Sequence, residues 1–576
     1  MISFSDKIKQ LFSQSVPLKP ASQVSTPSYV DWASILGKDW ERWQAAITAA
    51  HCGPRVLIAT SMGGFQGGAL LESTLAVALT LRGAKVDILL CDSFLPGCQL
   101  TEIGNINPKD LLASQPQPRC ATCYPSGKRV FEPLGLPIYW YSQLVIKQQA
   151  AEAQRIAQEI PLGEIENYRL DNMAVGEHAM AGALRYFARG DLQGEPAGEV
   201  ILRLYLKSAL LTVYATRALA RRNKYDVACF NHGIYAPQGL IGEVCRQEGL
   251  RVVNWNPAYR KHTFIFSHND SYHHTMITEP KRRWEDLTWS QELETPLLDY
   301  LQSRWVGTQD WIWFHEKPEE DLAQIAQETG VDFSRPVIGA LTSVMWDAKL
   351  HYHSNAFPNM VEWIKYTIEY FAQRPDLQLL IRVHPAEVRG TLPSRQLLMA
   401  EIRGLFPTLP HNVFVIPPES QVSTYAAMEQ CDTVIIYNTK TGIEISSMGI
   451  PVIVAGEAWI RNKGFSLDAS SPVEYRRLLD QLPLMERLSP QELQRARKYA
   501  FHFFFRRMIP LPFINPVEPK AAKMRLDLNG LDELYPGKYP GLDIICEGVL
   551  KSADFDYPAE MHIHADAQRA HAKEVE

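Results

Sequence analysis

The stretch DTVIIYNTKTGIEISSMGIPVIVAG, residues 432–456, holds a strand, a polar loop, a helix and a second strand in immediate succession. The runs DTVIIYN (432–438) and PVIVAG (451–456) are short, apolar and rich in branched residues, and the segment that starts at Thr441 between them has the pattern of a helix. Strands that alternate with helices pair in parallel. This stretch therefore predicts an α/β fold.

The same alternation continues upstream of this stretch. Strand-like runs at 336–343, 377–385 and 412–418 are separated by predicted helices near 357–374, 394–405 and 421–430. Together with the two later runs, they predict a parallel sheet that helices cover on both faces.

The N-terminal half repeats this order of elements. RVLIAT (55–60), the loop SMGGFQGG (61–68), a helical segment and VDILLC (86–91) form one unit, which DVACFNHG (226–233), a helix and RVVNW (251–255) repeat. We therefore predict two doubly wound, Rossmann-like domains that face each other across a cleft. The expected limits are an N-terminal extension at 1–40, α/β domains at 41–302 and 303–480, and a C-terminal helix and tail at 481–576.

Composition excludes several classes of protein. The 576 residues are 46% hydrophobic and carry a net charge of -6, so we expect no nucleic-acid partner, which would need a basic surface. No run approaches the roughly 20 apolar residues of a membrane span, and the first residues lack a signal-peptide core, so we expect a cytoplasmic protein. The aromatic run FHFFFRRM (501–508) is either the end of a core helix or a peripheral contact with the inner face of the membrane.

Polar residues directly after apolar runs are the candidate ligand-binding residues, because ligands of doubly wound sheets bind beyond the carboxyl ends of the strands. IRVHPAE (381–387) places Arg382 and His384 at such an end. These side chains could bind a phosphate, and an imidazolium could donate a proton to a departing phosphate oxygen. A surface histidine beside a turn proline explains the same pattern equally well.

The loop between the predicted strand at 432–438 and the helix that starts at Thr441 has free backbone N–H groups, which favour a bound phosphate. Its candidate residues are Asn438, Thr439, Lys440, Thr441 and Gly442. Glu444, in the first turn, could accept both hydroxyls of a ribose, or could merely stabilise the helix. Neither His384 nor Glu444 is expected to be a packing residue.

GIEISSMGIPVIVAG (442–456) and RVHP (382–385) together resemble sequences of the capsule polysaccharide biosynthesis group of GT-B glycosyltransferases. That group includes Kdo transferases, and bacterial sialyltransferases with an HP motif are more distantly similar. The resemblance covers about 330–470 and implies that His384 contacts the phosphate of a nucleotide-sugar donor and Glu444 its ribose. It leaves CMP-, UDP- and GDP-sugars open as donors. We expect no cofactor and no metal, because the helix N-terminus and basic side chains can neutralise the phosphate charge.

Two further residues are candidates for catalysis. His232, at the end of DVACFNHG, could accept a proton from an acceptor hydroxyl or could brace a loop. Asp347, after the first strand of the C-terminal half, could be a base or an acceptor contact. The glycines of SMGGFQGG could line the acceptor side of the cleft or simply form a tight turn. SHNDSYHH (267–274) matches no known metal-site spacing, so we expect a polar loop at the cleft.

Cys120 and Cys123 have the two-residue gap of zinc ribbons and redox pairs, but no second pair follows. With Cys98 they could hold an ion if a fourth ligand came from elsewhere. Reduced, packed thiols are the preferred interpretation, and we expect the pair not to be required for activity.

The sequence thus predicts a GT-B glycosyltransferase that moves a sugar from a nucleotide-sugar donor to a glycan or lipid-linked acceptor in surface polysaccharide biosynthesis. Two other readings use a similar cleft: a CDP-polyol phosphotransferase or UDP-sugar 2-epimerase, and a protein that binds a nucleotide or glycan without turnover.

Overall fold

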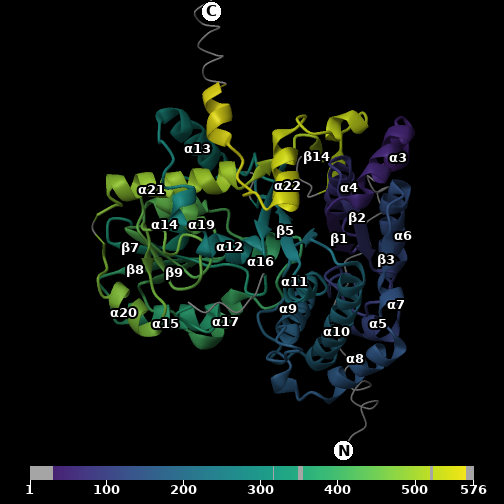
Figure 1. Ribbon diagram of the computed structural model, residues 1–576. Coiled ribbons are helices and arrows are strands. Elements are labelled where there is room, and N and C mark those ends of the chain that lie inside the picture. The colour runs from purple at the N-terminus through teal and green to yellow at the C-terminus, as the bar shows by residue number, and fades with distance from the viewer. Residues whose placement is uncertain (1–29, 315–316, 348–354, 485, 519–522, 566–576) are drawn as a thin grey trace, which may run out of the picture.

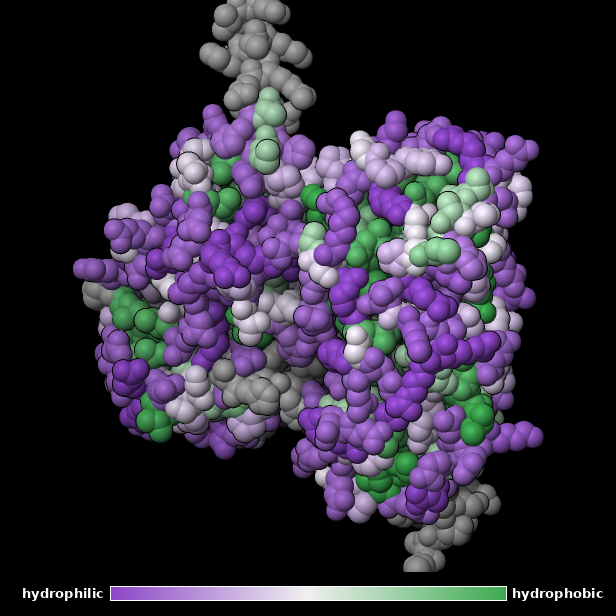
Figure 2. Space-filling view, viewed as in Figure 1, coloured by the Kyte–Doolittle hydropathy of each residue, from purple (hydrophilic) through white to green (hydrophobic). Residues whose placement is uncertain are grey.

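The computed structural model describes residues 30–314, 317–347, 355–484, 486–518 and 523–565. Most of the expected N-terminal extension and the end of the tail therefore lie outside the described residues. The rest of the chain forms two lobes, each built on its own sheet (Figure 1). Hydrophilic residues cover most of the face of both lobes shown in Figure 2.

The N-terminal sheet has seven strands in the order β13-β6-β5-β4-β1-β2-β3. Its strands are β1 (Arg55–Ser61), β2 (Lys85–Leu90), β3 (Ile138–Trp140), β4 (Val227–Asn231), β5 (Arg251–Pro257), β6 (Thr263–His268) and β13 (Ile509–Pro510). The first five pair in parallel, and β6 and β13 add an antiparallel edge. Val56 and Ile58 of β1 pack into one apolar cluster, whereas Leu57 and Ala59 pack into another, so helices cover both faces.

The C-terminal sheet has six strands in the order β12-β11-β10-β7-β8-β9, all parallel. They are β7 (Val337–Leu341), β8 (Gln378–Arg382), β9 (Val413–Ile416), β10 (Thr433–Ile436), β11 (Val452–Val454) and β12 (Leu467–Asp468). Ile338 and Ala340 face one apolar cluster, and Val337 and Leu341 face the other. The predicted fold class, two doubly wound α/β domains, is confirmed.

The helices connect these strands and cover the sheets. In the N-terminal half they are α2 (Trp32–Gly37), α3 (Trp40–Ala49), α4 (Gln66–Leu81), α5 (Pro108–Ala113), α6 (Cys120–Phe131), α7 (Tyr141–Leu144), α8 (Lys147–Glu159), α9 (Val175–Phe187), α10 (Gly198–Asn223), α11 (Gln238–Gln247), α12 (Tyr272–Thr278) and α13 (Gln291–Ser303). In the C-terminal half they are α14 (Leu322–Thr329), α15 (Met360–Ala372), α16 (Ala386–Arg389), α17 (Leu398–Leu405), α18 (Thr424–Glu429), α19 (Thr441–Ser447), α20 (Pro472–Leu479), α21 (Pro490–Phe501) and α22 (Pro540–Lys551).

The chain crosses between the lobes more than once. Helix α13 packs into the apolar cluster on one face of the C-terminal sheet, as does α21. The segment after α21 then returns to the N-terminal lobe, where β13 pairs with β6 and α22 packs on α4. A small antiparallel pair, β14 (Ile514–Pro516) and β15 (Met524–Leu526), lies along this return. The segment expected as a tail thus completes the N-terminal sheet.

The aromatic run at 501–508 lies in the protein core. Phe501, Phe503 and Phe504 are fully buried, the last two in a π-helical turn, His502–Arg506. They are therefore not available to contact a membrane, and this segment does not provide the peripheral contact considered above. Within the described ranges, every helix falls short of the length or apolar character that crossing a bilayer requires.

Candidate functional site

A cavity of about 460 Å³ lies where the loops after three parallel strands of the C-terminal sheet face the N-terminal lobe. Loops after β7, β8 and β10 contribute Thr342, His384 and Lys440, and the N-terminal lobe contributes Tyr259 and His273. The cavity thus occupies the position predicted from the polar residues that follow the strands.

His384 is fixed in one tautomer by the backbone. Its Nδ1 atom accepts a hydrogen bond from the backbone N–H of Ala386 at 3.0 Å. The backbone N–H of His384 donates to Thr342 Oγ1 at 3.1 Å. Burial and the nearby charges of Arg382 and Lys440 lower its pKa to about 4. At neutral pH the imidazole is therefore uncharged and carries its proton on Nε2, so His384 can donate a hydrogen bond but is not the imidazolium considered from the sequence.

Lys440 and Glu444 form a buried ion pair with Arg304. Glu444 Oε1 contacts Lys440 Nζ and lies 3.1 Å from Arg304 Nε, while the hydroxyl of Tyr425 donates to Glu444 Oε2. Burial raises the pKa of Glu444, but the charges of Arg304 and Lys440 outweigh it and lower this pKa to about 2. Arg304 also pairs with Asp310.

This arrangement corrects the expectation that Glu444 faces solvent and ligand. The carboxylate is buried, and Arg304, Lys440 and Tyr425 line the cavity in front of it. Glu444 therefore orients the two cations and is not placed to accept ribose hydroxyls. The pKa of Lys440 is lowered to about 8, by burial first and then by Arg304, against the attraction of Glu444.

Two other predicted donor-site residues serve the structure of the lobe. Arg382 lines the cavity, but it is buried and donates to the carbonyl oxygens of Pro417, at 2.5 Å, and Ser420, at 3.4 Å, so its guanidinium braces the loop before α18. Gly442 is required for packing, because a Cβ there would lie 2.6 Å from Cδ1 of Ile436. Neither result was evident from the sequence, which gives position along a strand but not the direction of a side chain.

Asn438, Thr439 and Thr441 line the cavity as predicted, together with Lys440. Ser343 Oγ donates to Asn438 Oδ1 at 2.8 Å, which leaves the amide NH₂ of Asn438 as a donor. The hydroxyls of Thr439 and Thr441 lie 3.3 Å apart at the start of α19. The loop after β10 thus offers neutral hydrogen-bond donors next to one lysine.

Asp347 lies on the cavity wall and connects the two lobes. Its Oδ1 atom accepts a hydrogen bond from the hydroxyl of Tyr235, in the N-terminal lobe, at 3.0 Å. His232 does not line the cavity. It lies behind Tyr235 and His273, with ring centroids 4.9 and 6.0 Å away, and burial lowers its pKa to about 3. Asp347 is therefore the better placed of the two predicted proton acceptors.

Sequence reasoning missed the aromatic wall of the cavity. Trp305 and Tyr425 stack with an interplanar angle of 8° and ring centroids 5.7 Å apart. Trp305 and Trp313 belong to a segment without strand or helix periodicity, so no pattern indicated them. Glu457 also lines the cavity, directly after the apolar run 451–456, and the rule that found His384 could have found it.

Among the described residues that line the cavity, none belongs to the glycine-rich loop 61–68. Gly67 and Gly68 lie in the first turn of α4, and Gly63 and Gly64 pack against α6. SHNDSYHH, expected to be a loop, ends β6 and begins α12, from which His273 reaches the cavity.

Two mostly parallel sheets with a cavity between their lobes define the class: a two-domain α/β protein with an interdomain cavity. Residues 331–485 match the family model described as capsule polysaccharide biosynthesis protein. This match confirms the predicted resemblance for the C-terminal lobe, which supplies most of the cavity. The search of curated proteins found no match to the chain.

Several solved structures are similar at low identity. The β-Kdo 2,4-transferase of KpsC from Thermosulfurimonas dismutans is 12% identical, with a TM-score of 0.32, over 48% of this chain and 80% of that one. The β-Kdo 2,7-transferase of the same protein is 11% identical, with a TM-score of 0.29, over 55% and 86%. A UDP-GlcNAc 2-epimerase from Neisseria meningitidis is 10% identical, with a TM-score of 0.23, over 77% and 98%. At such TM-scores none of the three bears on the substrate or reaction of this chain.

Proposed function

We propose that the protein is a glycosyltransferase that moves a sugar from a nucleotide-sugar donor to a glycan or lipid-linked acceptor in surface polysaccharide biosynthesis. The observation that carries the proposal is the neutral His384, whose Nδ1 accepts a backbone N–H so that its Nε2–H remains a donor, in an interdomain cavity whose C-terminal wall belongs to the matched family region.

In this proposal the donor phosphate binds next to His384 and Lys440. The imidazole N–H and the amide of Asn438 are neutral donors, and Lys440 adds a charge that Glu444 only partly offsets. The aromatic pair Trp305 and Tyr425 gives a flat surface for the base or the sugar. Such prearranged donors stabilise the charge that grows on the phosphate as the bond to the sugar breaks.

The acceptor binds on the side of the N-terminal lobe. In a direct displacement, an acceptor hydroxyl attacks the anomeric carbon, the bond from that carbon to the phosphate oxygen breaks, and the nucleotide leaves with the bonding electrons. The hydroxyl proton passes to a base. Asp347 is our candidate, because it lies on the cavity wall and its Oδ1 atom accepts a hydrogen bond from the hydroxyl of Tyr235, in the N-terminal lobe, at 3.0 Å.

A thermal-shift screen against CMP, CDP, UDP, GDP and their sugars tests the first part. A ligand at 100 times its dissociation constant adds about 2.7 kcal/mol of stability, which raises the melting temperature. Mass spectrometry of the products then separates the alternatives. A transferase releases the nucleotide and lengthens an acceptor, a 2-epimerase changes the sugar without an acceptor, and a binding protein gives no product.

A further inference from the structure

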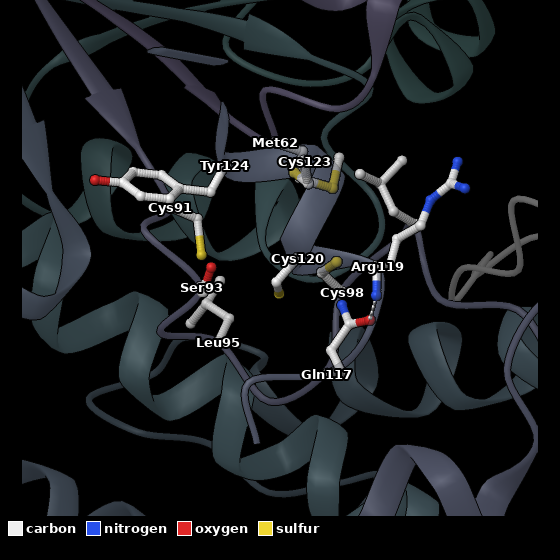
Figure 3. Close-up of a pocket in the computed structure, with 11 residues that line it drawn as sticks. Met62, Cys91, Ser93, Leu95, Cys98, Gln117, Arg119, Cys120, Cys123 and Tyr124 are labelled. Carbon is white, nitrogen blue, oxygen red and sulfur yellow. Dashed lines mark hydrogen bonds between the residues drawn. The ribbon is translucent and has the colours of Figure 1, made fainter. Parts of the chain in front are cut away.

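Four cysteines of the N-terminal lobe line one small cavity, separate from the cleft (Figure 3). Cys91 follows β2 directly, Cys98 lies in the irregular segment after it, and Cys120 and Cys123 lie in the first turn of α6. The sequence interpretation lacked this fourth thiol, since Cys91 ends an apolar run and lies 29 residues before Cys120.

The four thiols are close enough to affect one another. Burial raises the pKa of each, and within every one of the six pairs the charge of one thiolate raises the pKa of the other further. All nine cysteines of the chain are free of disulfides. These raised pKa values keep the four thiols protonated at neutral pH, so a metal that binds them must displace four protons.

Each thiol also receives hydrogen bonds that stabilise its thiolate. The Gly64 N–H donates to Cys123 Sγ at 3.1 Å, and a Cβ at Gly64 would lie 3.1 Å from that sulfur. Backbone groups of Phe94 and Leu95 lower the pKa of Cys91, that of Leu100 lowers the pKa of Cys98, and Gln117 with the Ser93 hydroxyl lowers the pKa of Cys120. Hydrogen bonds to ligating sulfurs are typical of iron–sulfur proteins.

The placement of the four thiols around one cavity suits a cluster that they share. A zinc ion requires all four sulfurs about 2.3 Å from one point. In the parts of the chain that the structure covers, no three cysteine, histidine or carboxylate groups come together as ligands of one metal ion. The four thiols instead surround a cavity, as they do around a cubane whose four iron corners each take one thiolate.

We propose that Cys91, Cys98, Cys120 and Cys123 bind a [4Fe–4S] cluster. Assembly from two ferrous ions, two ferric ions and four sulfide ions forms four iron–cysteine bonds, releases four thiol protons and needs no further oxidant. The cluster would tie the end of β2, the segment that follows it and the start of α6 to the glycine turn at Gly63 and Gly64. The proposal does not depend on the transferase function, since these residues lie outside the cleft.

The first test is the metal content of the full chain, purified without oxygen and reconstituted with equal amounts of ferrous and ferric iron and with sulfide. We expect about four iron and four acid-labile sulfide per chain, with an electron paramagnetic resonance signal after reduction. One zinc per chain, or neither iron nor sulfide after reconstitution, would contradict the proposal.

The second test compares Cys98→Ala and Cys120→Ala with Cys245→Ala, which is buried in the same lobe but lies outside the cavity. We expect iron and sulfide to fall by more than half in the first two variants and to stay unchanged in the third.

If Cys98→Ala and Cys120→Ala do not fold, alkylation of the wild-type protein still tests whether the four cavity thiols bind a cluster. The exposed Cys52 should react at once, and the four cavity thiols only after a chelator removes iron. Rapid labelling of all four without a chelator would refute the cluster.

Discussion

His384 Nδ1 accepts the backbone N–H of Ala386 at 3.0 Å, so the chain itself decides which nitrogen of the imidazole faces the cavity. Because the pKa of His384 is lowered to about 4, its Nε2 carries a proton at neutral pH without a positive charge. The residue can thus bind a phosphate without first being protonated, and its interaction becomes stronger as negative charge develops on a leaving group.

Replacing His384 with alanine should weaken binding of the nucleotide found by the thermal screen. Loss of a hydrogen bond to a charged phosphate costs about 1.5 to 3 kcal/mol, a roughly ten- to hundredfold loss of affinity. Calorimetric titration measures this, with His411→Ala, an exposed histidine of the same lobe, as the matched control. Equal affinity of wild type and His384→Ala would remove His384 from the donor site.

Lys440 predicts how nucleotide affinity depends on pH. Its pKa is lowered to about 8, so the side chain loses its charge as the pH rises through that value, and affinity for a phosphate should fall there. Lys440→Met should bind more weakly at pH 7 and lose this dependence. Lys463→Met is the matched control, since the pKa of Lys463 is also lowered to about 8 but the residue lies outside the cleft. A constant affinity of the wild type from pH 7 to pH 9 would contradict this role.

Glu444→Ala should destabilise the fold, not merely weaken donor binding. Removing Glu444 leaves Lys440 without its counter-charge and Arg304 with Asp310 alone, and breaking a buried ion pair costs about 3 to 5 kcal/mol. The pKa of Glu444 is lowered from 4.5 to about 2, so the unfolded chain binds more protons in this range and the contribution of Glu444 is lost as the pH falls from 4.5 to 2.

Denaturant unfolding of wild type, Glu444→Ala and the exposed-site control Glu369→Ala, at pH 7 and at acid pH, measures this contribution. The stability difference between wild type and Glu444→Ala should shrink toward acid pH. If Glu444→Ala is as stable as wild type at pH 7, the carboxylate of Glu444 does not stabilise the fold and this prediction is wrong.

Asp347→Asn should lower turnover and leave nucleotide affinity unchanged. If Asp347 accepts the acceptor proton, the rate should fall by about 10²- to 10⁴-fold. Tyr235→Phe, which removes the hydrogen bond to Asp347 but keeps the carboxylate, should have a smaller effect on turnover. Full activity of Asp347→Asn would leave Glu457 and His273, on the same cavity wall, as candidates for the base.

The fold and the floor of the site could be predicted from the sequence because apolar runs mark buried strands. Strands β8 and β10 end within three residues of the predicted limits, and His384 and Lys440 follow them as expected. An acidic residue in the first turn of a helix, by contrast, looks the same whether it faces solvent or a buried arginine. The burial of Glu444 depends on Arg304, which comes from a segment 140 residues earlier.

Contacts between distant segments account for the other omissions. Trp305 reaches the cavity from a stretch without periodicity, and the return of residues 509–551 to the N-terminal sheet follows from packing against β6 and α4. Cys91 joins Cys98, Cys120 and Cys123 only after β2 and α6 are placed side by side. Spacing along the chain contains none of this information.

A crystal structure of the protein with the nucleotide selected by the thermal screen tests the central claim most directly. We predict that a phosphate oxygen lies within hydrogen-bonding distance of His384 Nε2 and next to Lys440 Nζ, with the nucleotide inside the interdomain cavity. A nucleotide bound elsewhere, for example at the glycine turn before α4, with the cavity around His384 unoccupied, would contradict the account.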